Sequence, residues 1–152
     1  MKNIILSPYS RVMRNGKVNP KNYPYFKELV ALIKAKGFNV IQIGRRGEEL
    51  IPGVDEMRAD LSLSDLSDLA RGAYTWISVD NFFPHLCNLI GVQGYVIFGP
   101  SDPEIFGHKS NINILKDRGY LRGKQFDIWE VVDHHNEAFL SPEEVMMILK
   151  LS

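Results

Sequence analysis

The sequence predicts an α/β fold in which a mostly parallel β-sheet carries helices on both faces. Short apolar runs with the length of buried strands alternate along the chain with segments whose apolar residues recur at helical spacing. Strands that alternate with helices are typical of parallel sheets. The chain has 152 residues, of which 45% are hydrophobic and 24% charged, so it can bury a real core. We expect residues 1–152 to form one domain, because no repeat, low-complexity tract or linker interrupts them.

The first part of the chain supplies three predicted strands and one helix. Residues 3–6 form a short apolar run that predicts a buried strand, and the polar residues 7–22 predict a loop. Residues 25–36 carry apolar side chains at helical spacing and are followed by a glycine, so they predict a helix. A second strand is expected at residues 39–43 and a third, shorter one within residues 51–61.

The middle of the chain continues the alternation. Residues 64–71 predict a helix whose N-cap is Ser62 or Ser64. The apolar residues 74–79 and 95–98 predict two more strands of the same sheet.

The remaining elements are shorter. A helix is expected at residues 84–90, and residues 111–115 and 128–132 are β-strand candidates. The run Ser141-Pro142-Glu143-Glu144 has a cap residue, a first-turn proline and first-turn acids, so it predicts the start of the last helix.

Composition and charge exclude several classes of protein. Eighteen basic side chains balance eighteen acidic ones, which gives no electrostatic basis for general nucleic-acid binding or membrane-surface binding. No apolar stretch is long enough to span a bilayer. The single cysteine, Cys87, cannot form an internal disulfide, is expected in the core and fits a cytoplasmic location. Asp133, His134 and His135 are predicted as a loop, and no metal site is expected, because no further ligand stands at metal-binding spacing.

Two of the predicted strands end in polar, turn-forming residues. Asp80-Asn81 follows the strand at 74–79, and Gly99-Pro100-Ser101-Asp102-Pro103 follows the strand at 95–98. Because ligands of open α/β sheets bind beyond the carboxyl ends of the strands, we expect one crevice here. A helix that starts near Phe83 would point free backbone N–H groups into this crevice, where they suit a phosphate.

His85, one turn into that helix, is a candidate to donate a hydrogen bond to the same anion. The alternative is that Asp80 or Asn81 only caps the helix and that His85 contacts a neighbouring residue.

Two loops add candidate ligand-binding residues. The loop at residues 7–22 carries side chains able to clamp a diphosphate, although the same composition suits a solvated surface loop. These side chains are Ser10, Arg11 and Lys21. After the second strand, Glu48 or Glu49 is placed to accept hydrogen bonds from ribose hydroxyls, with Arg45 beside them. The glycine-rich signatures of dinucleotide-binding and P-loop proteins are absent.

Three motifs occur in order along the chain: Lys21-Asn22-Tyr23-Pro24, then Asp80-Asn81-Phe82-Phe83-Pro84-His85-Leu86 ahead of Gly91, then Phe98-Gly99-Pro100-Ser101-Asp102-Pro103. Their combination resembles the C-terminal, nucleotide-sugar-binding half of the heptosyltransferase-like glycosyltransferases, glycosyltransferase family 9. The likeness covers most of the chain. It implies a Rossmann-like, doubly wound sheet that forms one half of a GT-B fold.

The resemblance also implies roles for residues. Lys21 and the turn from Asp80 to His85 would hold the diphosphate of a nucleoside-diphosphate sugar, and Glu48 or Glu49 would hold the ribose. The turn Gly99-Pro100-Ser101-Asp102 would line the sugar side. No metal or other cofactor is required by these roles.

The implied function is donor binding in glycosyl transfer, completed by a homodimer or by a separate acceptor-domain chain. The first alternative is a non-catalytic protein that binds or sequesters a nucleotide or nucleotide sugar. A third interpretation is a compact enzyme acting on nucleotides, with Asp80 or His85 as acid or base.

Two departures from the family pattern change these expectations. Phe82 stands where the family has a glycine, and a phenylalanine obstructs both positive φ and close approach of a phosphate to the backbone. Phe82 is instead able to stack on a base or a sugar. In the family the catalytic acid belongs to the other half of the enzyme, so no catalytic residue is assigned in this chain.

Overall fold

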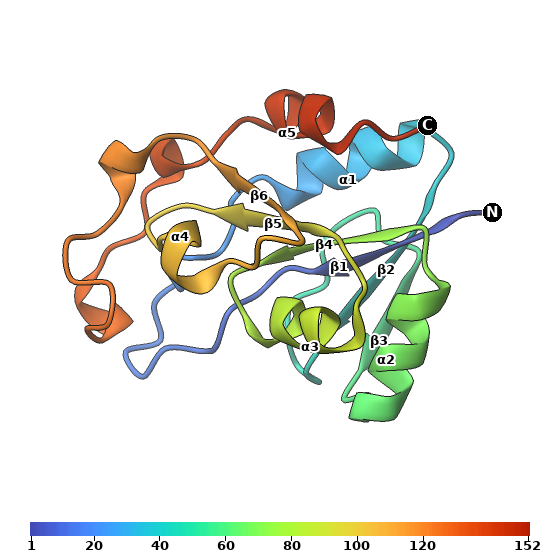
Figure 1. Cartoon of the computed structure of the whole chain (residues 1–152), viewed down its shortest axis with the longest axis horizontal. Helices are drawn as coiled ribbons and strands as arrows, with labels where there is room; N and C mark the ends of the chain where they lie inside the picture. Colours follow the sequence, from blue (N-terminus) through green and yellow to red (C-terminus); the bar gives the residue numbers. More distant parts are fainter.

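The computed structural model describes residues 1–152, and its six strands form one sheet in which every neighbouring pair is parallel. The strand order is β3-β2-β1-β4-β5-β6 (Figure 1). The strands are β1 Asn3–Ser7, β2 Asn39–Gly44, β3 Glu56–Ala59, β4 Thr75–Val79, β5 Tyr95–Phe98 and β6 Ile112–Leu115. The predicted α/β sheet is confirmed, and the strands predicted at residues 3–6, 39–43, 74–79, 95–98 and 111–115 begin and end within one residue of the observed strands.

Helices cover both faces of the sheet (Figure 1). Helices α1 (Phe26–Ala35) and α5 (Pro142–Leu149) pack on one face, and α2 (Leu63–Gly72) and α3 (Phe82–Ile90) pack on the other. A short helix, α4 (Pro103–Phe106), follows β5. The strand order reverses between β1 and β4, which gives the predicted doubly wound, Rossmann-like arrangement.

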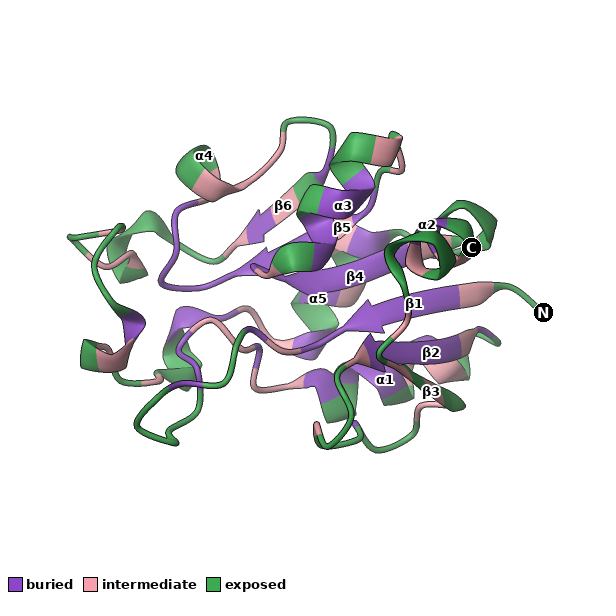
Figure 2. Ribbon diagram, turned by 90° about the horizontal axis from the view of Figure 1, so that it is seen from below, coloured by how far each residue is buried: buried purple, intermediate pink, exposed green.

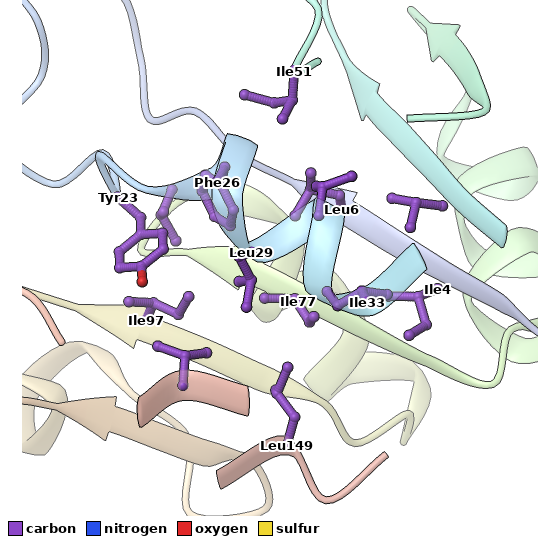
Figure 3. Packing of buried hydrophobic residues seen from close by; sticks show 14 of the residues in the cluster. Ile4, Leu6, Tyr23, Phe26, Leu29, Ile33, Ile51, Ile77, Ile97 and Leu149 are labelled. Atoms are coloured by element: carbon purple, nitrogen blue, oxygen red, sulfur yellow. The ribbon is translucent and has the colours of Figure 1, made fainter. Parts of the chain in front are cut away.

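Alternation of side chains along the strands produces two cores. In β1, Ile4 and Leu6 point to the face covered by α1 and α5, whereas Ile5 points to the face covered by α2 and α3. In the larger core, Leu29 of α1 and Leu149 of α5 converge on the strands (Figure 3). The smaller core includes the buried thiol of Cys87, as expected, and burial raises its pKa to about 12. Buried residues accordingly line the middle strands in Figure 2.

Local signals account for the ends of the helices. Gly37 follows α1 with a φ of 90°, a conformation that favours glycine. Of the two candidate caps of α2, Ser62 is the one used, and its hydroxyl accepts the N–H of Asp65 at 3.1 Å. Helix α5 begins with the predicted cap at Ser141, which forms a reciprocal capping box with Glu144.

One predicted strand is wrong. Residues 128–132 form no strand, and Trp129–Val131 is a 3₁₀ helix within a long excursion between β6 and α5. The excursion holds two further 3₁₀ helices, Arg118–Tyr120 and Asn136–Ala138. The apolar run did not become a strand because the excursion packs its Trp129 side chain, which is 9% exposed, against the loop after β1, while Val131 stays exposed.

The topology positions a crevice. Neighbouring strands β1 and β4 separate the two halves of the sheet, and Ser7 pairs in register with Ser78 at their carboxyl ends. The chain leaves β1 toward α1 on one face and leaves β4 toward α3 on the other. Diverging connections at such a switch point leave a gap in which ligands of doubly wound folds bind.

Gly94 tests the packing of the smaller core. A Cβ atom at residue 94 would overlap the indole ring of the fully buried Trp76. We expect Gly94→Ala to lower the free energy of unfolding by about 1–3 kcal/mol, as overpacking does. Gly123→Ala is the matched control, because a Cβ there meets no atom within 4 Å, and it should change stability by less than about 1 kcal/mol. Equal urea midpoints for the two variants would contradict the packing described here.

Candidate functional site

A cleft of about 890 Å³ lies at the carboxyl ends of β1, β2 and β4. Four segments line it: the loop after β1, the loop after β2, the end of β3 with the start of α2, and the first turn of α3. Most of the residues proposed from the sequence line this cleft. They are Ser10, Arg11, Lys21, Arg45, Glu48, Asp80, Asn81 and Phe82.

The side chain of Asn81 ties the first and fourth strands together. Its amide nitrogen donates to Ser7 Oγ at 2.9 Å and to the carbonyl of Tyr9 at 3.1 Å. Its amide oxygen accepts the backbone N–H of Phe83 at 3.0 Å and so caps α3. One side chain therefore fixes both the start of the β1 loop and the start of α3.

Lys21 and Asp80 form the floor of the cleft. Lys21 Nζ lies 3.6 Å from Asp80 Oδ2, and the two side chains are 16% and 10% exposed. The hydroxyl of Ser10 donates to the carbonyl of Asp80 at 2.6 Å. Lys21 also lies 5.4 Å from the ring centroid of Trp129, which places its ammonium over an aromatic face. The predicted meeting of Ser10, Lys21 and Asp80 is thus found.

Sequence reasoning missed the contribution of the excursion between β6 and α5. The carboxylate of Glu130 accepts hydrogen bonds from both terminal guanidinium nitrogens of Arg11 at 2.9 Å and from the backbone N–H of Arg14 at 3.1 Å. These hydrogen bonds, of which the one from Arg11 has the largest effect, lower the pKa of Glu130 to about 2. Trp129 has a second cation over its ring besides Lys21, the guanidinium of Arg122, which lies 4.5 Å from the ring centroid. No local pattern marks Glu130 or Trp129 as part of this region, because Arg11 and Lys21 lie more than a hundred residues before them in the sequence.

The start of α3 offers fewer donors than the sequence suggested. The helix begins at Phe82, the N–H of Phe83 is taken by Asn81, and Pro84 has no N–H. The amides of Asn81 and Phe82 donate to no group of the protein and remain available. The ring of Phe82 is 57% exposed and lines the cleft beside them.

The loop after β2 distinguishes the two candidate glutamates. The carboxylate of Glu48 accepts the backbone N–H of Arg45 and lines the cleft. Glu49 does not line it, and the carbonyl of Glu49 accepts the Tyr9 hydroxyl at 2.8 Å. Burial, followed by the charge of Glu49, raises the pKa of that hydroxyl to about 12. Glu48 is therefore the glutamate placed to meet a ligand.

The expectation that His85 points into the crevice is corrected by the structure. His85 lies outside the cleft, and its Nδ1 is 2.8 Å from Nε2 of His108. The contact forms because His85 lies on the side of α3 that meets the segment after α4. Burial and the charge of His85 lower the pKa of His108. The alternative, that His85 contacts a neighbouring residue, is the one the structure supports.

The turn after β5 is likewise not part of the cleft. The carbonyl of Pro100 accepts the N–H of Arg122 at 3.0 Å, and the Asp102 carboxylate pairs with both guanidinium nitrogens of Arg118 at 3.0 and 2.8 Å. Ser101 is fully buried, and Gly99 packs directly against the ring of Phe139. Gly99, Pro100, Ser101 and Asp102 therefore secure the excursion instead of lining the cleft.

The structure also bears on metal binding and membrane insertion. No group of three or more His, Cys, Asp or Glu side chains is arranged to hold a metal ion. None of the helices combines the length and the apolar character needed to cross a bilayer.

Several solved structures share this fold. E. coli heptosyltransferase WaaC with ADP superposes with a TM-score of 0.68 at 18% identity, over 98% of this chain and 43% of that one. The chain has the fold of part of a GT-B glycosyltransferase. The family 9 glycosyltransferase from Veillonella parvula gives a TM-score of 0.67 at 17% identity, over 96% of this chain and 44% of that one. The predicted likeness to heptosyltransferases is confirmed for the fold.

A third solved structure is the dodecameric, iron-containing heptosyltransferase TibC of E. coli in complex with ADP-D-beta-D-heptose. It gives a TM-score of 0.62 at 17% identity, over 78% of this chain and 32% of that one. The chain thus spans less than half the length of each of these structures. No protein-family model matches the sequence, and no curated protein matches it.

Asn81 is testable as the tether of the cleft. We expect Asn81→Ala to lower the free energy of unfolding by about 2–3 kcal/mol, because it removes a helix cap and two donated hydrogen bonds. Asn81→Asp keeps the cap but cannot donate to Tyr9, so it should recover about 1 kcal/mol of that loss. Chemical denaturation measures both variants. Full stability in Asn81→Ala would show that Asn81 does not tether β1 to α3.

Glu130 provides a test by pH. Its depressed pKa means that the folded protein binds fewer protons than the unfolded chain, so the Arg11 pair stabilises the fold above pH 4.5. That contribution disappears as the pH falls through about 2, the folded-state pKa. Carbon-detected NMR of the Glu130 carboxyl should follow this titration. In Arg11→Ala the midpoint should move up toward 4.5, and a wild-type midpoint already at that value would contradict the ion pair.

Proposed function

We propose that the cleft binds a nucleoside-diphosphate sugar and that the chain is the donor-binding part of a glycosyl-transfer enzyme. The observation that carries the proposal is the arrangement at the carboxyl ends of β1 and β4. There the Lys21 ammonium and the unpaired amides of Asn81 and Phe82 line one cleft that suits a diphosphate. Glu48, on the adjoining loop, is placed to accept hydrogen bonds from ribose hydroxyls.

The fold supports the same ligand. Two of the similar solved structures are complexes with ADP and with ADP-D-beta-D-heptose. The doubly wound sheet of this chain has its cleft at the switch point, where nucleotides bind in such sheets. The exposed ring of Phe82 adds an apolar surface at the cleft that can stack on a base or a sugar.

The chemistry follows from the charge that develops in the reaction. The bond between the anomeric carbon and the diphosphate oxygen breaks, and an acceptor oxygen bonds to that carbon and loses its proton to a base. Negative charge accumulates on the departing nucleoside diphosphate, where Lys21 and the amides of Asn81 and Phe82 can stabilise it. Because protein groups can stabilise this negative charge, we expect no requirement for a metal ion.

The acceptor and its base are expected to come from outside the cleft described here. A second domain, a separate chain or a second copy of this chain are the sources that a GT-B arrangement allows. Retention of a donor by residues 1–152 without turnover, even with candidate partners added, would instead favour the non-catalytic nucleotide-sugar binder.

Lys21 provides the binding test. Isothermal titration calorimetry with ADP-, UDP- and GDP-sugars should detect at least one ligand, with the same affinity in Mg²⁺ and in EDTA. Lys21→Ala should weaken the binding of that ligand by about 10- to 100-fold, equivalent to about 1.4–2.7 kcal/mol of binding free energy. Lys27→Ala, an exposed lysine on α1, is the matched control and should bind as the wild type does. Absence of binding across the panel would refute the proposed function.

A further inference from the structure

Positive charge near the floor of the cleft is already compensated within the protein. Lys21 pairs with the carboxylate of Asp80, and Arg11 pairs through two hydrogen bonds with Glu130. These are the two cations that the sequence pointed to for a diphosphate. Each has a carboxylate partner within the protein, so this end of the cleft carries no excess of positive side chains.

The excess lies on the other side of the cleft, at the loop after β2. Arg45 lines the cleft, and its guanidinium forms no ion pair and no hydrogen bond with the protein. Arg46 also lines the cleft, and its side chain is 91% exposed. Its guanidinium has only a 3.9 Å contact with Asp60, whose carboxylate also accepts the backbone N–H of Arg46 at 3.3 Å. The one glutamate of this loop that faces the cleft, Glu48, is bonded to the backbone N–H of Arg45. The positive charge in this part of the cleft is therefore available to bind an anionic ligand.

The backbone of this loop is held in one shape. The N–H of Glu48 donates to the carbonyl of Arg45 at 3.2 Å, which closes a turn. The Glu48 carboxylate folds back onto the same residue, and it lies so close to Gly44 that a Cβ atom there would overlap it. Gly47 has a φ of 92°, which this turn requires. Both arginines are thus presented from a fixed turn at the mouth of the cleft.

Position and chemistry together select an anionic group. In doubly wound sheets the residues just beyond β2 meet the ribose, where an acid binds free hydroxyls and an arginine accommodates a phosphate. A guanidinium also matches a phosphate through two parallel hydrogen bonds. This chain places Glu48 and two incompletely paired arginines at that point.

We propose that the cleft accepts a nucleotide that carries a phosphomonoester on its ribose, at the 2′ or the 3′ oxygen, and that Arg45 binds this group with Arg46 beside it. The inference rests on the proposed function, because it assumes that the ribose of a nucleotide lies against the loop after β2. It adds a second anionic group to the ligand, separate from the diphosphate bound near Lys21.

The test compares nucleotides that differ only in the ribose phosphate. Calorimetry is performed with the 5′-monophosphate, the 2′,5′-bisphosphate and the 3′,5′-bisphosphate of adenosine, guanosine and uridine, alongside ADP, GDP and UDP. One bisphosphate of the preferred base should bind the wild type at least 10-fold more tightly than the 5′-monophosphate, and the better isomer identifies the oxygen.

Variants assign the gain to the loop. In Arg45→Ala the bisphosphate should bind less than about 3-fold more tightly than the 5′-monophosphate. The affinity of this variant for the 5′-diphosphate should differ from that of the wild type by less than about 3-fold. Arg45→Lys should recover part of the advantage as a point charge. Arg71→Ala, which removes an exposed arginine on α2 away from the cleft, is the matched control and should keep the whole advantage.

The outcomes separate the two proposals. A bound 5′-diphosphate without a bisphosphate advantage, or an advantage that survives in Arg45→Ala, overturns this inference and leaves the proposed function standing. An advantage lost equally in Arg71→Ala would mean that net charge alone produces it, which also overturns the inference. Absence of binding by every nucleotide overturns both.

Discussion

The side-chain amide of Asn81 is the interaction on which the cleft depends. A doubly wound sheet sends the chain to opposite faces after β1 and after β4, so the backbone ladder does not hold the two exits together beyond the pair Ser7 and Ser78. Asn81 joins them by donating to Ser7 and Tyr9 while accepting from Phe83. The same residue that caps α3 therefore sets the width of the opening into which a ligand would fit.

Charge in the cleft is organised in two different ways. On the floor, cations are oriented by carboxylates that belong to the protein, as Lys21 is by Asp80, and this arrangement gives the partly buried ammonium a counter-ion. At the loop after β2, arginines are left in contact with solvent and only the backbone turn is fixed. The first arrangement favours rigid placement of one group, whereas the second leaves favourable electrostatic energy for an incoming anion.

The sequence predicted those parts of the molecule that local patterns encode. Apolar periodicity located the strands and main helices, and the polar residues after them located the cleft with Lys21 and Asp80. It could not place Glu130 against Arg11, because that contact joins the loop after β1 to a 3₁₀ helix 119 residues further along the chain. The direction of His85 was also undetermined, since it depends on how the segment carrying His108 folds back after α4.

The position of Trp129 makes the floor of the cleft visible to spectroscopy. The chain has two tryptophans, and Trp76 is fully buried among the apolar side chains of the smaller core. The Trp129 ring instead lies close to the Lys21 ammonium and the Arg122 guanidinium. Any ligand that draws Lys21 toward itself changes the electric field across that indole, so the intrinsic fluorescence of the unlabelled protein reports occupancy of the floor.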